Sequence, residues 1–114
     1  MISFVIPGSP KVLKRHRVSK WGGMYDPSKA DKEPIAALGL EGRLRAKKTI
    51  LTGKVSLKVI YYGLRSNADL SNGIKLIEDA LNGVVWVDDK QVYILSVFRA
   101  EGKPHRTEVE IEEL

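Results

Sequence analysis

Carboxylates and one lysine are concentrated between residues 68 and 92, in the stretch ADLSNGIKLIEDALNGVVWVDDKQV. Five acidic side chains fall within 21 residues: Asp69, Glu78, Asp79, Asp88 and Asp89. Hard divalent cations such as Mg²⁺ bind carboxylate oxygens together with the oxygens of a substrate phosphate. A lysine in the same cluster, here Lys75, can stabilise the charge that builds on a pentacoordinate phosphorus. These residue types therefore fit metal-assisted hydrolysis of a phosphodiester.

Each of these acids also has an ordinary structural explanation. Asp69 precedes a predicted helix and can cap its free backbone N–H groups. Glu78 and Asp79 can be solvated charges that pair with Lys75 one turn earlier. The Asp88-Asp89 pair can be an ordinary turn before a strand. Taken together, the acids are harder to explain in this way, because like charges placed close together lower stability unless a cation compensates them.

A predicted amphipathic helix over residues 70–82 would position most of these side chains. Its apolar residues recur at spacings of four, three and four: Leu70, Ile74, Ile77 and Leu81. Residues three or four apart share a helix face, so the opposite face carries the polar set Asn72, Lys75, Glu78 and Asp79. Asp69 would stand at the entrance of the helix. Asn82-Gly83 is expected to end it, which places Asp88-Asp89 in the turn beyond.

Predicted strands complete a single domain over residues 1–114. The strands are expected over residues 2–6, 54–62, 91–99 and 107–113. The resulting order β-α-β-α-β-β predicts the α/β (α+β) class, a mixed β-sheet with two helices packed on it. In the last strand Val109 and Ile111 alternate with glutamates, which predicts an edge strand with one solvated face. Trp86 lies in a short apolar run and is expected in the core or in a dimer interface.

The first helix is expected somewhere in residues 27–48, after an irregular basic stretch over residues 9–26. Asp26-Pro27 joins an N-cap residue to a proline at the first helical position, which favours a helix start there. Pro34 is expected to kink or delay this helix, and two glycines, Gly39 and Gly42, are expected to weaken it.

The spacing of the acidic segment resembles a known family of nucleases. Read from Asp69 to Val92, the string D-L-x-N-x-x-K-x-x-x-D-A-L-N-G-V-x-x-x-D-D-x-Q-V is similar to that of the RusA-type Holliday junction resolvases. The family also opens with a strand, a Gly-x-Pro, a Lys/Arg-rich loop and a Tyr-x-Pro. Here these are Gly8-Ser9-Pro10, Lys14-Arg15-His16-Arg17 and Tyr25-Asp26-Pro27. The resemblance implies a small, homodimeric endonuclease, common in prophages, that requires Mg²⁺ or Mn²⁺.

The resemblance also implies a substrate and roles for individual residues. The substrate would be four-way or otherwise branched DNA in recombination and repair, cut symmetrically by phosphodiester hydrolysis. Asp69 and Asp89 would be metal-binding carboxylates, and Lys75 would be the catalytic lysine. Asp79 and Asp88 would be supporting acids of the same metal site. Two active sites are needed for symmetric cleavage, and a two-fold dimer supplies them.

One residue departs from the family pattern. The best-studied pattern reads D-L-D-N, with a third metal carboxylate where this chain has Ser71. Three explanations compete: another acid (Glu78, Asp79 or Asp88) completes the coordination, Ser71 ligates weakly, or the enzyme is impaired. We favour the first. Glu78 lies two helical turns from Ser71, about 10 Å along the helix axis, so it would act through a second metal or a water. Asn72 is a further supporting residue.

The net charge of +5 divides unevenly along the chain. Residues 1–54 hold 12 Lys or Arg and 4 Asp or Glu, a net charge of +8. Residues 55–114 hold 7 Lys or Arg and 10 Asp or Glu, a net charge of −3. We refer to residues 11–20, KVLKRHRVSK, as the basic segment. Its residues predicted to bind nucleic acid are Lys11, Lys14, Arg15, His16, Arg17 and Lys20. A solvated loop is the alternative explanation of such a run.

The composition excludes several classes of protein. The absence of cysteine excludes disulfide scaffolds and thiolate metal sites, and it favours a reducing compartment, so a cytoplasmic location is expected. No run approaches the roughly 20 apolar residues of a membrane span, and no membrane partner is expected. No zinc finger or helix-turn-helix pattern is present, so DNA recognition would depend on backbone charge and DNA shape.

Two other functions stay open at this point. The first is a protein that binds branched DNA without cutting it, because its metal site has decayed at Ser71. The second is a basic RNA-associated protein in which the acids between residues 69 and 89 are structural. Cleavage of a synthetic four-way junction separates the first from a nuclease, and competition between structured RNA and a DNA junction tests the second.

Overall fold

Six main elements follow the predicted order along the chain in a computed structural model, which describes residues 1–12, 17–18, 24–25 and 28–114. They are β1 (Ile2–Pro7), α1 (Lys29–Arg45), β4 (Val55–Tyr62), α2 (Leu70–Leu81), β5 (Val92–Ala100) and β6 (Arg106–Glu113). A 3₁₀ turn, η1 (Asp89–Gln91), directly precedes β5. Two short strands, β2 (Arg17–Val18) and β3 (Met24–Tyr25), form a separate antiparallel pair.

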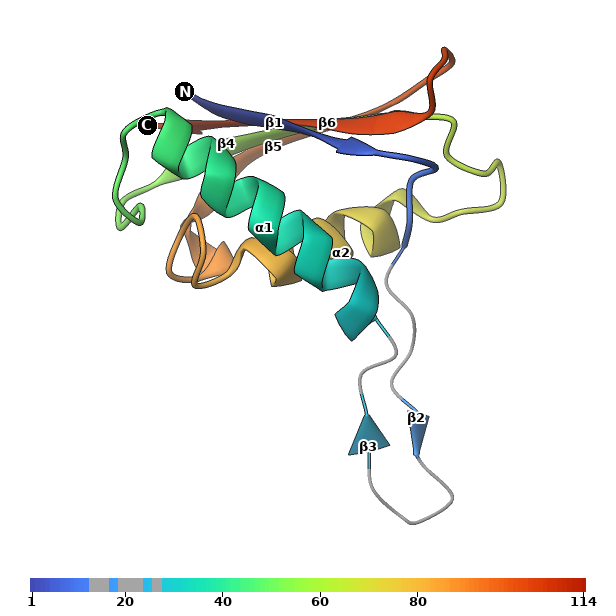
Figure 1. Cartoon of the computed structure of the whole chain (residues 1–114), viewed down its shortest axis with the longest axis horizontal. Helices are drawn as coiled ribbons and strands as arrows, with labels where there is room; N and C mark the ends of the chain where they lie inside the picture. Colours follow the sequence, from blue (N-terminus) through green and yellow to red (C-terminus); the bar gives the residue numbers. More distant parts are fainter. Residues whose placement is uncertain (13–16, 19–23, 26–27) are drawn as a thin grey trace.

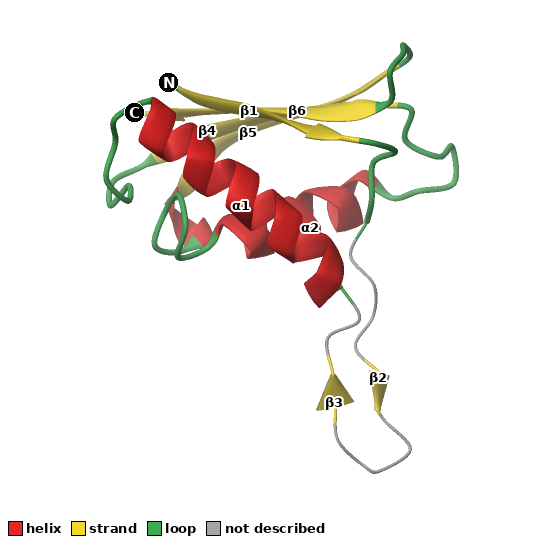
Figure 2. Cartoon of the chain, in the orientation of Figure 1, coloured by secondary structure: helices red, strands yellow, loops and turns green. Residues whose placement is uncertain are grey.

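The main sheet has four strands in the order β1-β6-β4-β5. β4 and β5 are parallel, while β6 runs antiparallel to both of its neighbours, β1 and β4. Both helices lie on one side of this sheet, and none of the described residues forms a helix on the other side, which we call the open face (Figure 1; Figure 2). The structure is a single compact domain of the α+β class, a mixed sheet with two helices packed on it, as the sequence predicts.

The core lies between the sheet and the two helices. Alternate residues of β4 point into it, and Val55, Leu57 and Val59 are fully buried, as the alternation predicts. From α2, the predicted apolar positions Ile74, Ile77 and Leu81 pack against them, while Leu70 is partly buried. Because this stripe fixes the rotation of α2, it also fixes where the polar face of that helix points.

Trp86 is a core residue. Its side chain is fully buried, and its indole Nε1–H donates a hydrogen bond to the Asn82 side-chain oxygen at 2.6 Å. Asn82 ends α2, and Gly83 follows with a φ of 77°, the left-handed conformation that glycine adopts without strain. The turn after α2 is therefore tied to the core, which helps to position the chain that leads to Asp89.

The prediction of β6 as an edge strand is wrong. β6 lies between β1 and β4, and the edges of the sheet are β1 and β5. The alternation that suggested an edge has another cause, because one face of the whole sheet is open. Val109 and Ile111 are buried on the side of the helices, whereas the alternating glutamates point to the open face. Alternation of apolar and polar residues indicates that a strand has one buried and one exposed face, but it does not indicate which strands pair with it.

Part of the stretch expected to be irregular is paired. Arg17 pairs with Tyr25 and Val18 with Met24, so a two-stranded ladder interrupts residues 9–26. Strands of two residues are too short for alternation to be visible in the sequence. The remaining residues of this stretch that the structure describes, 9–12, belong to no helix or strand.

The first helix differs from its prediction in one respect and agrees in another. It runs Lys29–Arg45, inside the predicted range, and Ser28 precedes it; Asp26-Pro27, the predicted start, lies outside the described residues. Pro34 is accommodated inside the helix. The two glycines serve the packing: a Cβ at Gly39 would collide with Leu81 of α2, and one at Gly42 would press on the Ser3 carbonyl of β1. Glycine here allows α1 to approach its neighbours closely.

Candidate active site

Lys75 connects two carboxylates that are distant in sequence. Its Nζ lies 3.1 Å from Asp79 Oδ1, one helical turn along α2, and 3.5 Å from Asp89 Oδ2 at the start of η1. From α1, Lys32 Nζ lies 3.9 Å from the other oxygen of Asp79. Together with Glu78, these residues form what we call the acid–lysine cluster: Lys32, Lys75, Glu78, Asp79 and Asp89. Three elements, α1, α2 and η1, contribute to it.

The turn that carries Asp89 is fixed by hydrogen bonds on both of its sides. The Gln91 side-chain oxygen accepts hydrogen bonds from the backbone N–H groups of Val87 and Asp88, each at 2.9 Å. The Gln91 side-chain amide donates to the carbonyls of Leu51 and Gly53, each at 2.9 Å. Asp89 is therefore anchored to the segment before β4, and its approach to Lys75 is built into the fold.

Charge and burial shift the titration of two members of the cluster. The hydrogen bond and charge of Asp79, followed by the charge of Asp89, raise the pKa of Lys75, so its ammonium stays charged at neutral pH. Burial, and then the negative charge of Asp89, raise the pKa of Glu78. Glu78 therefore lies within electrostatic reach of Asp89. The cluster holds three carboxylates and two ammonium groups, which leaves an excess of negative charge.

Asp69 and Asp88 both cap helical turns. Asp69 Oδ1 accepts a hydrogen bond from the Ser71 N–H at 2.8 Å, as expected of an N-cap residue of α2. Asp88 Oδ1 accepts from the Lys90 N–H at 3.1 Å, and this hydrogen bond lowers the pKa of Asp88. Within the part of the chain that the structure describes, no ion pair joins either residue to the acid–lysine cluster.

Ser71 and Asn72 lie in the first turn of α2, and both are exposed. They are one turn N-terminal to Lys75 and carry no interaction with the cluster among those observed for the described residues. The structure thus brings four of the predicted residues together: Lys75, Glu78, Asp79 and Asp89. Asp69, Ser71 and Asn72 are left at the N-terminal end of α2, whereas Asp88 caps η1 directly beside Asp89. The predicted roles of all eight stay predictions.

The donor set fits a hard cation, although its geometry is not that of a closed site. Across the residues that can be described, no group of three or more His, Cys, Asp or Glu side chains is arranged to hold a metal ion. The carboxylates of Asp79 and Asp89 are instead held by Lys75. Oxygen ligands and an excess of negative charge suit Mg²⁺ or Mn²⁺, which need only one or two protein carboxylates beside substrate oxygens.

Most of the basic segment lies outside the described residues. This applies to Lys14, Arg15, His16 and Lys20. Arg17 opens β2, but its side chain is not described. Lys11 is described: its Nζ lies 3.9 Å from Asp31 of α1, and its side chain is 64% exposed. This weak surface pair leaves Lys11 accessible to a phosphate.

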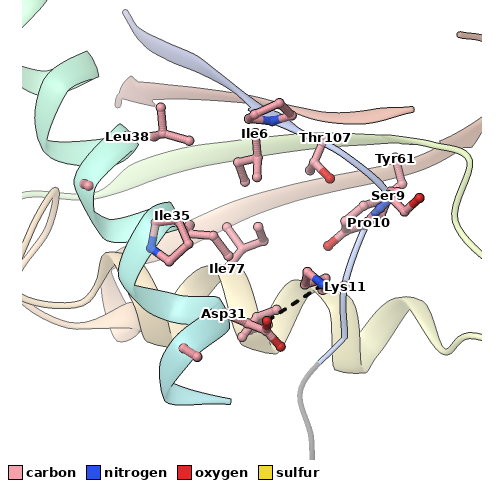
Figure 3. A pocket seen from close by; sticks show the side chains of 15 residues that line it. Ile6, Ser9, Pro10, Lys11, Asp31, Ile35, Leu38, Tyr61, Ile77 and Thr107 are labelled. Atoms are coloured by element: carbon pink, nitrogen blue, oxygen red, sulfur yellow. Dashed lines mark ion pairs between the residues drawn. The ribbon is translucent and has the colours of Figure 1, made fainter. Parts of the chain in front are cut away.

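An apolar cavity of about 510 Å³ lies between the end of β1 and the two helices, and Figure 3 shows the Lys11–Asp31 ion pair beside it. Ile35 and Leu38 of α1 and Ile77 of α2 line it. Tyr61 also lines it, and burial raises the pKa of its hydroxyl. No member of the acid–lysine cluster lines this cavity, so it is separate from the candidate active site.

A second surface hollow is lined by basic side chains that were not predicted as a group from the sequence. Lys11, Arg65 and His105 line a hollow of about 490 Å³, which we call the basic groove, together with Asp31, the acid that pairs with Lys11. Gly63, with a φ of 86°, lies directly under the His105 ring, and any Cβ there would collide with the imidazole. The three side chains come from three separate loops, so no local spacing in the sequence could reveal them. Lys32 of the acid–lysine cluster was missed for the same reason.

Comparison with known proteins agrees with the resemblance of the acidic segment. Residues 7–112 match the model of the family described as Endodeoxyribonuclease RusA. The chain is also 31% identical over 140 residues to a protein of Bacillus subtilis (strain 168) named "Uncharacterized protein YqaN", and the match covers 99% of this chain and 96% of that protein. The family match includes both the basic segment and every member of the acid–lysine cluster. The chain therefore belongs to the RusA family of endodeoxyribonucleases.

Proposed function

We propose that this protein is a divalent-metal-dependent endodeoxyribonuclease that resolves four-way DNA junctions by symmetric phosphodiester hydrolysis. Residues 1–114 would form one RusA-like endonuclease domain, acting in the cytoplasm in DNA recombination and repair, with a prophage origin. The observation that carries the proposal is Lys75, held 3.1 Å from Asp79 and 3.5 Å from Asp89, in a chain that matches a family of endodeoxyribonucleases over nearly its whole length.

Asp69 and Asp89 are the proposed ligands of Mg²⁺ or Mn²⁺, with Asp79 and Asp88 as supporting acids. The ion would supply Lewis-acid stabilisation and a bound water of lowered pKa. Lys75 stays charged beside these carboxylates and would place its ammonium against the negative charge that develops on the phosphorus oxygens. Its contacts with two carboxylates would orient that ammonium before the DNA arrives.

Glu78 is the best candidate for the acid that compensates for Ser71. It belongs to α2, next to Asp79, and the charge of Asp89 contributes to its raised pKa. This supports the explanation in which another acid completes the site. The substitution Ser71→Asp tests it: we expect a rate gain of less than about tenfold. A much larger gain would favour the alternative function, a junction-binding protein with an impaired site.

DNA binding would combine the basic segment with the basic groove. Each phosphate that a Lys or Arg neutralises releases condensed counterions, so affinity would depend steeply on salt. No element with recognition side chains is predicted, and selection of the substrate would depend on the shape of the junction. The partner of the chain would be a second copy of itself, since two nicks at symmetric positions require two active sites.

A cleavage assay tests the proposal. The purified protein is incubated with a synthetic four-way junction, and in parallel with a linear duplex of the same arm sequence, in Mg²⁺ or in Mn²⁺. We expect the junction to be cut and the duplex to be left intact. Equal cleavage of both substrates would contradict junction specificity. Tighter binding to structured RNA than to the junction, without cleavage, would favour the RNA-associated alternative.

A further inference from the structure

The apolar cavity between the end of β1 and the two helices has the size and the walls of a ligand site. Its volume of about 510 Å³ lies within the range of roughly 300–1,000 Å³ that is usual for small-molecule sites. Ile6, Tyr61 and Thr107 form its sheet side, from β1, β4 and β6. Figure 3 shows Ile35 of α1 and Ile77 of α2 on the side of the helices. Such walls suit a flat and largely apolar molecule.

Tyr61 brings to this cavity a hydroxyl that has no partner within the described part of the chain. The residue is 1% exposed, and none of the described residues forms a hydrogen bond with its hydroxyl. A Cβ at Gly73 would lie 3.0 Å from the hydroxyl oxygen, so α2 packs directly against the end of the ring. A buried hydroxyl without a hydrogen bond costs free energy. A ligand with a polar edge, seated in the cavity that Tyr61 lines, can supply that hydrogen bond.

The cavity continues into the basic groove. In the groove, the charges of Lys11 and Arg65 and the imidazole of His105 stand beside a single carboxylate, that of Asp31. This excess of positive charge favours a phosphate group. A site for a phosphate therefore adjoins a site for an apolar body. Four residues line both hollows: Ser9, Pro10, Lys11 and Asp31.

The cavity also lies close to the acid–lysine cluster. After burial, the charge of Glu78 contributes to the raised pKa of the Tyr61 hydroxyl, so the two side chains lie within electrostatic reach of each other. On α1, Asp31 lines the cavity, and the next residue, Lys32, lies 3.9 Å from Asp79 of the cluster. A ligand in the cavity therefore lies beside the residues proposed to cut DNA.

We infer that the cavity and the basic groove together bind one nucleotide of the junction DNA, with its base in the cavity and its phosphate in the groove. The base has apolar faces and a polar edge, which match the apolar walls and the Tyr61 hydroxyl. The phosphate matches the charges of Lys11 and Arg65. The nucleotide is one that leaves the base stack at the branch point, and an intact duplex offers no such nucleotide. Its assignment to junction DNA rests on the proposed function, whereas the chemistry of the site does not.

A junction with one unpaired nucleotide at the branch point tests the binding of the base. The same junction with an abasic site at that position keeps the backbone phosphate and lacks the base. In chelator, gel shift is expected to show roughly tenfold tighter binding of the base-bearing junction by the wild-type chain, because the base is buried against apolar walls. Equal affinities for the two junctions would overturn the inference.

Tyr61→Phe tests the hydroxyl. The preference for the base-bearing junction should fall by roughly fivefold, because one hydrogen bond to the base is lost. The matched control is Tyr62→Phe, at the next residue of β4, which points to the opposite face and packs against the Arg106 guanidinium at 3.8 Å. This control should keep the preference. Thermal unfolding of Tyr61→Phe should not occur at a lower temperature than in wild type, and a marked loss of stability would show that the hydroxyl has a partner within the protein.

Methyl NMR with a deoxynucleoside monophosphate locates the site. The methyl signals of Ile35 and Ile77 in the cavity wall should shift, while those of Ile94 on β5 should not. The deoxynucleoside without its phosphate should bind roughly tenfold more weakly, and Arg65→Gln should remove most of this difference. The matched control, Lys58→Gln on β4, should retain the difference. Unshifted signals in the cavity wall would overturn the inference.

Failure of this inference and failure of the proposed function give different results, because binding is measured without divalent metal. Junction cleavage in Mg²⁺ with unshifted methyl signals would overturn the nucleotide site and leave the nuclease intact. Methyl shifts with the free nucleotide, but equal affinity for the base-bearing and abasic junctions, would overturn the assignment to DNA and make the cavity a site for a free nucleotide. Base-dependent binding without cleavage in Mg²⁺ would support the nucleotide site and contradict the nuclease.

Discussion

The acid–lysine cluster and the basic segment both contain a lysine paired with an aspartate, but the two pairs differ in strength. Lys75 lies 3.1 Å from Asp79, touches a second carboxylate, and has a raised pKa. Lys11 lies 3.9 Å from Asp31, and 64% of its side chain is exposed. In the proposed mechanism, the first arrangement orients a charge for catalysis, whereas the second leaves a charge available for a phosphate. Changes in the cluster should therefore alter the rate of cleavage, and changes in the basic segment should alter affinity.

Asp89→Asn is expected to have the largest effect. The substitution keeps the size of the side chain and removes the charge proposed to hold the metal, so the cleavage rate should fall by about 1,000-fold or more. Affinity for the junction should stay within about threefold of wild type, as measured by gel shift in Ca²⁺. Turnover at the wild-type rate in Mg²⁺ would remove Asp89 from the mechanism.

Lys75→Ala is expected to reduce the rate by roughly 100-fold, because it removes one positive charge from the transition state. Its effect on junction affinity should be far smaller, since only one of many phosphate contacts is affected. Single-turnover cleavage and gel shift on the same junction separate the two quantities. Equal losses of rate and affinity would make Lys75 a binding residue and remove the contrast with Lys11.

The triple change Lys14/Arg15/Arg17→Ala is expected to act on affinity. Removal of three phosphate contacts should reduce the slope of log affinity against log salt by about 2.7. The cleavage rate at saturating protein should change little. The matched control is Lys58→Ala, a cation of β4 paired with Glu110 at 3.9 Å, which should leave the slope unchanged. An unchanged slope in the triple variant would place the DNA surface elsewhere.

Glu78→Gln is expected to have the smallest effect, on the pH dependence of stability in metal-free buffer. Burial and the charge of Asp89 raise the pKa of Glu78 in the folded protein. Between its ordinary pKa and the raised value, the folded state binds more protons than the unfolded state, so the free energy of unfolding falls as pH rises. From about pH 4 to pH 7, urea unfolding should show a smaller fall in Glu78→Gln than in wild type. Equal falls would show that Glu78 titrates normally.

Local pattern was sufficient to predict the elements with one buried face. The stripe Ile74, Ile77 and Leu81 and the alternation of β4 both match their burial. Local pattern was insufficient where the place of an element depends on the other elements that pack beside it. The place of β6 in the centre of the sheet depends on which strands flank it. A central strand and an edge strand show the same alternation of apolar and polar residues when one face of the sheet is covered.

In the candidate site, too, local contacts could be predicted from the sequence and long-range contacts could not. The contact between Lys75 and Asp79 follows from a spacing of four residues on one helix, so the sequence predicts it directly. The contact between Lys75 and Asp89 depends on the turn that Gln91 ties to the carbonyls of Leu51 and Gly53, which lie about 40 residues earlier in the chain. Contacts that depend on such long-range anchoring, including that of Lys32 with Asp79, could not be read from spacing.

The most direct test of the account measures binding and cleavage of one four-way junction while divalent metal is titrated. With chelator present, the protein should bind the junction and leave every strand intact. As Mg²⁺ or Mn²⁺ is added, two nicks at symmetric positions on opposite strands should appear, without a comparable change in affinity. Binding with no cleavage at any metal concentration, or cleavage in the presence of chelator, would contradict the claim that the acid–lysine cluster is the centre of a metal-dependent nuclease.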